Sequence, residues 1–245
     1  MGVGAMFAPR EDWAALAQRF AAEGRLRLPE ALPEAQAKAW HGLLAQAGYA
    51  LMLTQGGQGQ VLAPEALAQL SPAAREALQR ELHQAASQGV GFLYEGHQLA
   101  ASQNPDLRAV LAAVNAPETL AQVRALTGFQ DITHADGQAT RYRGGHFLTR
   151  HRDDIPGQAR RVAYVLSLTE RWHPDWGGLL QFFEDNGTPR DAWVPGWNVL
   201  SLFDVRHVHS VTYVAPFAGA PRLSITGWFR AGPRQAGPRQ AGPRP

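Results

Sequence analysis

The 245-residue sequence contains no cysteine. This absence excludes disulfide frameworks, thiolate zinc sites, iron–sulfur clusters and a cysteine nucleophile, so any metal must use His, Asp or Glu side chains. No apolar run approaches the roughly 18 residues of a membrane span, and the N-terminus lacks the basic and apolar segments of a signal peptide. We therefore expect a cytoplasmic protein with no membrane partner.

The sequence also has little net charge, +2 at pH 7. Three arginines of the C-terminal repeat AGPRQAGPRQAGPRP (231–245) account for this excess, because without them the net charge would be −1. The rest of the chain is close to neutral, which argues against a nucleic-acid partner. The repeat has no large apolar residue, so we expect residues 231–245 to be a disordered tail.

Hydrophobic residues make up 45% of the chain, enough for a sizeable core. Apolar spacing predicts a mainly helical supporting region over residues 1–128, with helices at 11–20, 33–48 and 71–89 and shorter ones at 107–114 and 118–126. From residue 129 to 230 the period changes to two. Runs such as RVAYVLSL, WNVLSLF and RLSITGWF alternate with turn signals, which predicts a many-stranded β core, either a barrel or a sandwich.

The stretch FLTRHRDD (147–154) carries the first candidate site. In an extended segment, side chains two residues apart share a face, so His151 and Asp153 would point together and could ligate a metal. Asp154 competes with Asp153, but it would point to the opposite face. Asp153 is the preferred ligand.

The stretch RHVHSV offers a further histidine ligand, either His207 or His209, which share a strand face. Two histidines and one carboxylate leave positions open on a metal, as in non-haem Fe(II) oxygenases. Zinc with the same ligands would instead support hydrolysis, so these residues alone leave the reaction open.

Thirteen residues beyond His209, the strand RLSITGWF places Arg222 and Ser224 on one face. A guanidinium meets a carboxylate through two charge-assisted hydrogen bonds, and a neighbouring hydroxyl can add a third. A metal at one end and an arginine at the other describe a site for 2-oxoglutarate. A surface salt bridge is the alternative role for Arg222.

The segments YRGGHFLTRHRD, RRVAYVLSLTERWHPDWGGLLQFF, HSV and RLSITGWF, taken in this order, resemble the 2-oxoglutarate/Fe(II)-dependent oxygenases, and within them the prolyl hydroxylases. The resemblance covers about residues 129–230. It implies an α+β fold, with a double-stranded β-helix (a cupin-like jelly roll) as the catalytic core, supported by N-terminal helices.

The resemblance also implies roles for individual residues. His151, Asp153 and His209 would bind iron, and the His-Ser-Val pattern favours His209 over His207. Arg222 would anchor the distal carboxylate of 2-oxoglutarate, with Ser224 beside it. Tyr142 matches a tyrosine that donates a hydrogen bond in the cosubstrate pocket. Ser167 departs from the family pattern, because many relatives have another tyrosine there; water, Tyr164 or Tyr142 could fill its place.

The function implied is a dioxygenase that uses Fe(II), 2-oxoglutarate and O2, with ascorbate as an optional reductant, and releases succinate and CO2. The expected substrate is a prolyl residue in a protein, in particular one of the translation machinery. Three alternatives stay open: hydroxylation of a free amino acid or small molecule, oxidative demethylation of nucleic acid, and a non-catalytic metal-binding barrel. Gly177 and Gly178 could mark either a bulge or a close approach of backbone or substrate.

Overall fold

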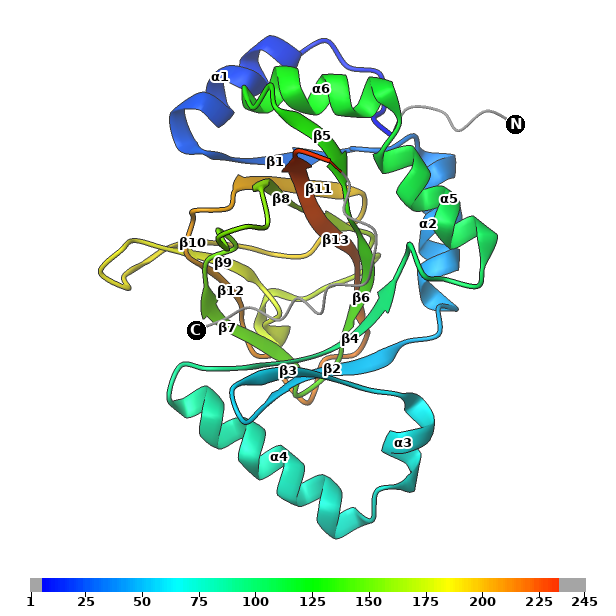
Figure 1. Cartoon of the computed structure of the whole chain (residues 1–245), viewed down its shortest axis with the longest axis vertical. Coiled ribbons are helices and arrows are strands. Elements are labelled where there is room, and N and C mark those ends of the chain that lie inside the picture. The colour runs from blue at the N-terminus through cyan, green and yellow to red at the C-terminus, as the bar shows by residue number, and fades with distance from the viewer. Residues whose placement is uncertain (1–5, 234–245) are drawn as a thin grey trace.

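The computed structural model describes residues 6–233, which form one curled antiparallel sheet with helices packed against it (Figure 1). No helix within these residues is long and apolar enough to span a membrane. The last strand runs through Ala231, so the first residue of the predicted tail belongs to the sheet. Residues 234–245, on which most of the tail prediction falls, lie outside the described residues.

The described helices cover the positions at which helical periodicity was found. They are α1 (Trp13–Glu23), α2 (Glu34–Ala45), α3 (Pro64–Gln69), α4 (Pro72–Ser87), α5 (Pro105–Val114) and α6 (Pro117–Thr127), with a 3₁₀ turn at Pro174–Trp176. Their start signals act as expected: the Ser71 side chain accepts a hydrogen bond from the Ala74 N–H at 3.2 Å, and Pro72 occupies the first turn of α4.

The described strands all join a single sheet. They are β1 (Arg25–Pro29), β2 (Ala50–Gln55), β3 (Gln58–Leu62), β4 (Phe92–Gln98), β5 (Ile132–Ala135), β6 (Gln138–Tyr142), β7 (Phe147–His151), β8 (Arg160–Ser167), β9 (Leu180–Phe183), β10 (Pro189–Trp193), β11 (Val199–Asp204), β12 (His209–Val211) and β13 (Arg222–Ala231).

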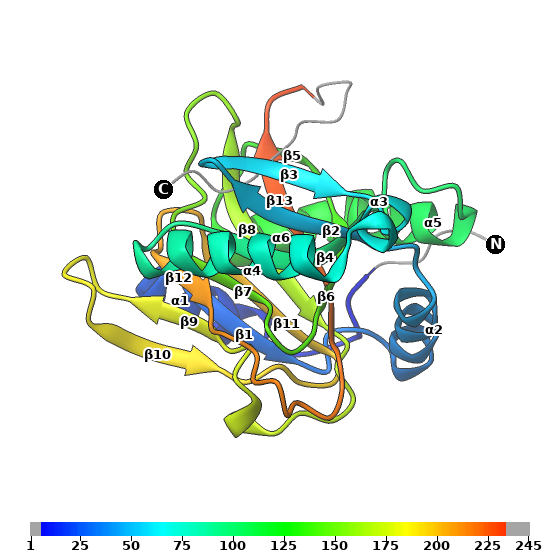
Figure 2. The same cartoon turned by 90° about the horizontal axis from the view of Figure 1, so that it is seen from below.

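The sheet folds back on itself, as Figure 2 shows. Its strand order is β1-β11-β8-β13-β6-β4-β7-β12-β9-β10, with β2 and β3 beside β4, and β5 beside β13. Side chains join the two ends, because Phe182 of β9 packs edge-on against Phe203 of β11 at 5.2 Å and Arg25 of β1 pairs with Asp191 of β10 at 2.6 Å. The curled sheet encloses an interior, and the metal-ligand candidates lie there.

Helices α1, α2, α5 and α6 cover the outer face of the β11-β8-β13 portion of the sheet. A single apolar core joins Phe20, Leu44 and Val123 of these helices to Leu166 and Ile225 of the strands. The residues that alternate with this set on β8 and β13 face the interior. One face of β8 and β13 therefore packs against the helices, and the other face lines the interior that holds the candidate site.

The sequence prediction for residues 1–128 missed four strands, β1 to β4. These segments have few β-branched residues, so their composition gave little strand signal. For β1, tertiary burial stabilises the strand, because Leu26 and Leu28 enter the helix-covered core where β1 pairs with β11. Gly56 and Gly57 form the two-residue turn of the β2–β3 hairpin with positive φ at both positions. The boundary at residue 128/129 stays a prediction.

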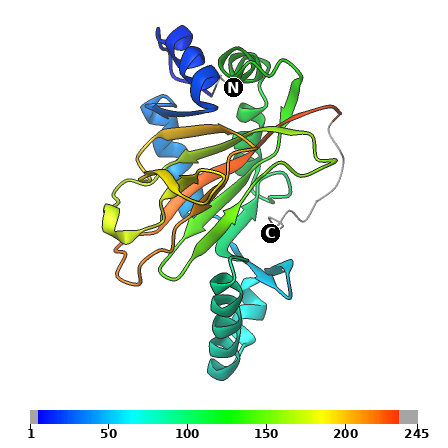
Figure 3. The ribbon, with the colours of Figure 1, turned by 90° about the vertical axis from the view of Figure 1, so that its left-hand side faces the viewer.

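Helices α3 and α4 project from the sheet on the side away from α1 and α6 (Figure 3). Helix α4 has 16 residues, and Leu82 is the one buried among them. The helix therefore covers little of the sheet. It packs against β2 and β4, and a hollow lies between it and β7.

Candidate metal centre

Two strands bring the predicted ligands together. His151 ends β7 and His209 begins β12, and the two residues are directly opposite in the antiparallel ladder between these strands. Their rings lie 4.2 Å apart between centroids, and Asp153 follows β7 by two residues. One ligand atom from each of these three residues lies within 4.8 Å of the others, so they form a compact cluster.

Hydrogen bonds fix how the two imidazoles are turned. The Nδ1 of His151 lies 2.9 Å from the Thr149 carbonyl oxygen, and the Nδ1 of His209 lies 3.0 Å from that of His207. Each Nδ1–H can donate to its carbonyl, which leaves the Nε2 lone pair free for a metal. Both Nε2 atoms face Asp153, at 3.7 Å for His151 and 3.4 Å for His209.

Burial and neighbouring charges set the protonation of this cluster. Burial and, to a smaller extent, the adjacent His151 lower the pKa of His209 to about 4, so its imidazole is neutral at pH 7. Burial alone would raise the pKa of Asp153, but His209, His151 and Arg160 together hold it below its usual value. Neutral imidazoles and an ionised carboxylate are the ligand forms that Fe(II) requires.

The two competing residues lie elsewhere. His207 packs near Gly24, whose hypothetical Cβ would lie 2.6 Å from the His207 Nε2. Asp154 is exposed and outside the cluster. The sequence preference for His209 and Asp153 agrees with this placement.

Arg222 and Ser224 lie together in the interior, with 3% and 0% of their surface exposed. The Arg222 guanidinium lies 5.1 Å from the Tyr142 ring and makes no hydrogen bond or ion pair with another described residue. The Ser224 hydroxyl is also buried without a partner. A buried cation without an anion is costly, so this pair fits a carboxylate ligand.

Tyr142 pairs with Arg222 in the ladder between β6 and β13. Its ring stacks on Tyr94 of β4 at 5.3 Å, and the charges of Asp153 and Arg160 act on Tyr94 in turn. The two stacked tyrosines thus connect the Arg222 end of the interior to the metal-ligand cluster. Sequence analysis missed Tyr94, because β4 was not recognised as a strand.

Ser167 does not offer a free hydroxyl where relatives have a tyrosine. Its Oγ accepts a hydrogen bond from the Gly196 N–H at 3.2 Å and donates to the Thr169 hydroxyl at 3.3 Å. Tyr164 cannot take over, because it lies on the opposite face of β8 and donates its hydroxyl to the Asp136 carbonyl at 2.9 Å. Of the substitutes considered, Tyr142 is the tyrosine beside Arg222.

Sequence analysis also missed Arg160 and Trp228, which lie next to Asp153. The Arg160 Nη1 is 3.4 Å from the Asp153 Oδ1, and its guanidinium stacks 3.4 Å from the Trp228 ring centroid. The Arg160 Nε and Nη2 are buried without hydrogen-bond partners, and the buried Trp228 indole N–H helps to hold the pKa of Asp153 below its usual value. Alternation along β13 could have found Trp228, since it shares the face of Arg222 and Ser224.

The two glycines at 177 and 178 allow close backbone packing beside Arg222. A Cβ at Gly177 would lie 2.0 Å from the Tyr213 carbonyl oxygen, and one at Gly178 would lie 3.0 Å from Trp172 and 3.6 Å from the Arg222 Cδ. Both have positive φ. Close approach, the second of the two sequence interpretations, explains them.

Comparisons with known proteins agree with this geometry. Residues 137–230 match the family model of the 2OG-Fe(II) oxygenase superfamily. Mouse (Mus musculus) prolyl 3-hydroxylase OGFOD1 is 34% identical over 101 residues, which is 38% of this chain and 18% of that protein. The match therefore spans less than a fifth of that relative's length.

Solved structures share the fold. A Pseudomonas putida prolyl-4-hydroxylase has a TM-score of 0.61 and 23% identity, covering 90% of this chain and 100% of its own. A Trichoplax adhaerens prolyl hydroxylase, solved in complex with a peptide fragment of hypoxia inducible factor, has a TM-score of 0.60 and 15% identity, covering 89% of each chain. These likenesses confirm the α+β double-stranded β-helix that the sequence predicted.

Proposed function

Because residues 137–230 match the family model of the 2OG-Fe(II) oxygenase superfamily, we propose that the protein is a 2-oxoglutarate-dependent dioxygenase that hydroxylates a prolyl residue of a protein. The observation that carries the cosubstrate part is Arg222, a buried guanidinium without an anionic partner among the described residues. The observation that supports a peptide substrate is the pair of unpaired N–H donors of Arg160, Nε and Nη2, beside Asp153.

In this proposal His151, Asp153 and His209 hold Fe(II), because they supply two imidazole nitrogens and one carboxylate within 4.8 Å of one another. The chemistry supplied by the bound metal is the transfer of one oxygen atom of O2 to a substrate carbon while 2-oxoglutarate becomes succinate and CO2. The strands β7 and β12 supply rigid positions, so little reorganisation is needed when ligands bind.

Arg222 and Ser224 would bind the distal carboxylate of 2-oxoglutarate, and Tyr142 would pack beside it. A guanidinium gives this carboxylate a fixed direction through two parallel hydrogen bonds. The stacked rings of Tyr142 and Tyr94 keep water from the space between Arg222 and the metal ligands. Orientation and exclusion of water are thus the contributions of the protein itself.

A prolyl substrate suits the donors around Asp153. Proline in a chain has no amide N–H but keeps its carbonyl oxygens as acceptors. An amide carbonyl next to the reacting ring could accept from the Arg160 Nε or Nη2, buried donors that otherwise stay unpaired at a cost of about 1–3 kcal/mol each. The prolyl 3-hydroxylase relative and the peptide-bound prolyl hydroxylase structure support the same class of substrate.

The test is a library of proline-containing peptides, including segments of translation-machinery proteins, treated with enzyme, Fe(II), 2-oxoglutarate and O2, with and without ascorbate. Mass spectrometry should find a gain of one oxygen on proline that requires every cofactor and is absent with His209→Ala. Succinate formation that responds to free amino acids but to none of the peptides would support the small-molecule alternative. Lack of succinate under all conditions would favour a non-catalytic barrel.

A further inference from the structure

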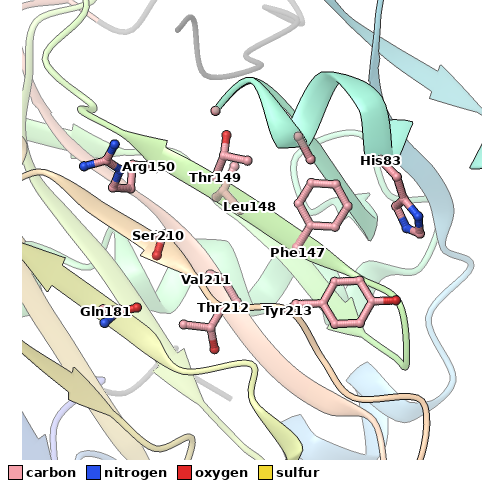
Figure 4. Close-up of a pocket in the computed structure, with 12 residues that line it drawn as sticks. His83, Phe147, Leu148, Thr149, Arg150, Gln181, Ser210, Val211, Thr212 and Tyr213 are labelled. Carbon is pink, nitrogen blue, oxygen red and sulfur yellow. The ribbon is translucent and has the colours of Figure 1, made fainter. Parts of the chain in front are cut away.

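A groove lies on the outer face of the sheet, between α4 and strands β7, β9 and β12 (Figure 4). We call it the α4 groove; its volume is about 680 Å³, and its lining includes His83, Phe147, Arg150, Gln181, Ser210 and Tyr213. The metal-ligand candidates point to the other side of the same strands: Arg150 precedes His151 on β7, and Ser210 follows His209 on β12. The groove is therefore separate from the site described above.

One end of the α4 groove is aromatic. The rings of Phe147 and Tyr213 stack at 6.2 Å between centroids, and the His83 ring of α4 lies 6.4 Å from the first and 6.2 Å from the second (Figure 4). Tyr213 is 44% exposed, so part of its largely apolar side chain faces solvent. An exposed aromatic surface beside a hollow is typical of a site that binds a bulky apolar side chain.

The other end of the groove is cationic. The Arg150 guanidinium is exposed, lies 5.4 Å from the Phe183 ring, and makes no ion pair with any carboxylate in the described residues. No acidic residue lines the groove within residues 6–233. Gln181 and Ser210 supply further polar side chains on the Arg150 side of the groove (Figure 4). The charge of the groove thus complements an acidic partner.

The spacing of the two ends suits an extended chain. Phe147 and Arg150 are three residues apart on β7, about 10 Å at the rise of a β-strand. We propose that the α4 groove binds a segment of the protein substrate that flanks the hydroxylated proline and carries a bulky apolar and an acidic side chain about three residues apart. This inference rests on the proposed function, because it takes the partner to be a protein substrate.

The α4 groove lies close enough to the metal-ligand cluster for one substrate molecule to reach both. A segment in the groove lies one sheet away from the metal-ligand cluster, a thickness of roughly 10 Å. An extended linker of roughly five residues reaches about 17 Å, which exceeds this thickness. Contacts in the groove would therefore add affinity for substrate without touching the reacting atoms.

A binding experiment tests the groove without any turnover. The probes are two peptides with a neutral dye, Gly-Ser-Phe-Ser-Gly-Glu-Ser-Gly and the same peptide with Lys in place of Glu, and fluorescence anisotropy gives their affinities. The wild type should prefer the Glu peptide by roughly threefold or more, and Arg150→Glu should reverse the preference. Tyr213→Ala should weaken both peptides alike.

The matched control is Arg19→Glu, which makes the same charge change at an exposed position of α1 and should leave both affinities unchanged. An unchanged preference in Arg150→Glu, or no binding of either peptide to the wild type, would overturn the assignment of the groove.

A kinetic experiment then tests the link to substrate. A proline peptide that the enzyme hydroxylates is compared with the same peptide joined through five residues to the Phe/Glu segment. The extension should lower KM and leave kcat unchanged, and Arg150→Glu should remove that advantage. An extension without effect would show that the groove does not serve the substrate. If no proline peptide is hydroxylated at all, the proposed function fails, while the anisotropy result still decides whether the groove binds such segments.

Discussion

Replacement of Arg222 by methionine should change stability and cosubstrate affinity in opposite directions. The Arg222 side chain is buried, 3% exposed, and lacks an anionic partner among the described residues, so its charge is uncompensated until a carboxylate binds. Methionine has a similar stem and no charge. Within residues 6–233, the Arg222 guanidinium lies beside the Tyr142 ring, and no carboxylate forms an ion pair with it.

The magnitudes follow from the cost of buried charges. Replacing a buried ionic group with an apolar one of similar volume stabilises proteins by about 1–4 kcal/mol, so ligand-free Arg222→Met should gain an amount in this range. Removing one partner of a buried charge pair costs about 3–5 kcal/mol, so the Kd for 2-oxoglutarate should rise by roughly two to four orders of magnitude. In the wild type, 2-oxoglutarate at 100 times its Kd should add about 2.7 kcal/mol.

The assay is urea unfolding with Mn(II) in place of Fe(II), which prevents turnover, with and without 2-oxoglutarate. Mn(II) affinity, measured alone by calorimetry, should not fall in Arg222→Met, because the three metal ligands stay in place. Arg160→Met is the matched control: Arg160 is buried too but lies 3.4 Å from Asp153, so its loss should destabilise the protein. A less stable Arg222→Met that keeps the 2-oxoglutarate response would refute the argument and make Arg222 a packing residue.

Three further outcomes test other parts of the site. His209→Ala should lose Mn(II) binding in calorimetry, whereas His207→Ala should keep it; loss in both would contradict the ligand assignment. Gly177→Ala should lower the free energy of unfolding by at least about 1 kcal/mol, because its Cβ would lie 2.0 Å from the Tyr213 oxygen, while Gly48→Ala, with open space around it, should show no such clash penalty. Burial lowers the pKa of His209 to about 4 from 6.5, so the unfolded chain binds its proton more readily. Stability of the metal-free protein should therefore be full above pH 6.5 and fall by up to about 3 kcal/mol as the pH drops to 4, and urea unfolding of His209→Gln should show a shallower fall.

The β core could be predicted from sequence because its strands alternate. Along β13, the face with Leu223 and Ile225 enters the helix-covered core, and the face with Arg222 and Ser224 lines the interior. A period of two is visible in any single sequence when both faces have different chemistry. The strands of the N-terminal region lack this contrast. For β1, the tertiary pairing with β11 decides the conformation, and no local signal reports that contact.

The metal-ligand candidates could also be predicted, because His151 and Asp153 are near neighbours and His209 stands in a recognisable pattern. Arg160 and Trp228 could not be assigned in the same way. Their importance comes from a contact between β8 and β13, in which the guanidinium lies over the indole and both face Asp153. Neither residue is unusual in its own strand. Only the three-dimensional pairing shows that the Arg160 Nε and Nη2 are buried without partners.

The charges in the interior explain why the two halves of the site belong together. Asp153 is offset by Arg160 at 3.4 Å, which leaves the charge of Arg222 as the excess. Fe(II) adds two positive charges and 2-oxoglutarate two negative ones, so binding both leaves the net charge of the interior unchanged, whereas binding either one alone shifts it by two. Unbalanced charge is costly in a buried site, so each ligand should raise the affinity of the other. The histidines on β7 and β12 and the arginine on β13 are therefore coupled through charge as well as through the fold, and the loss of Arg222 should weaken this coupling while the three metal ligands stay in place.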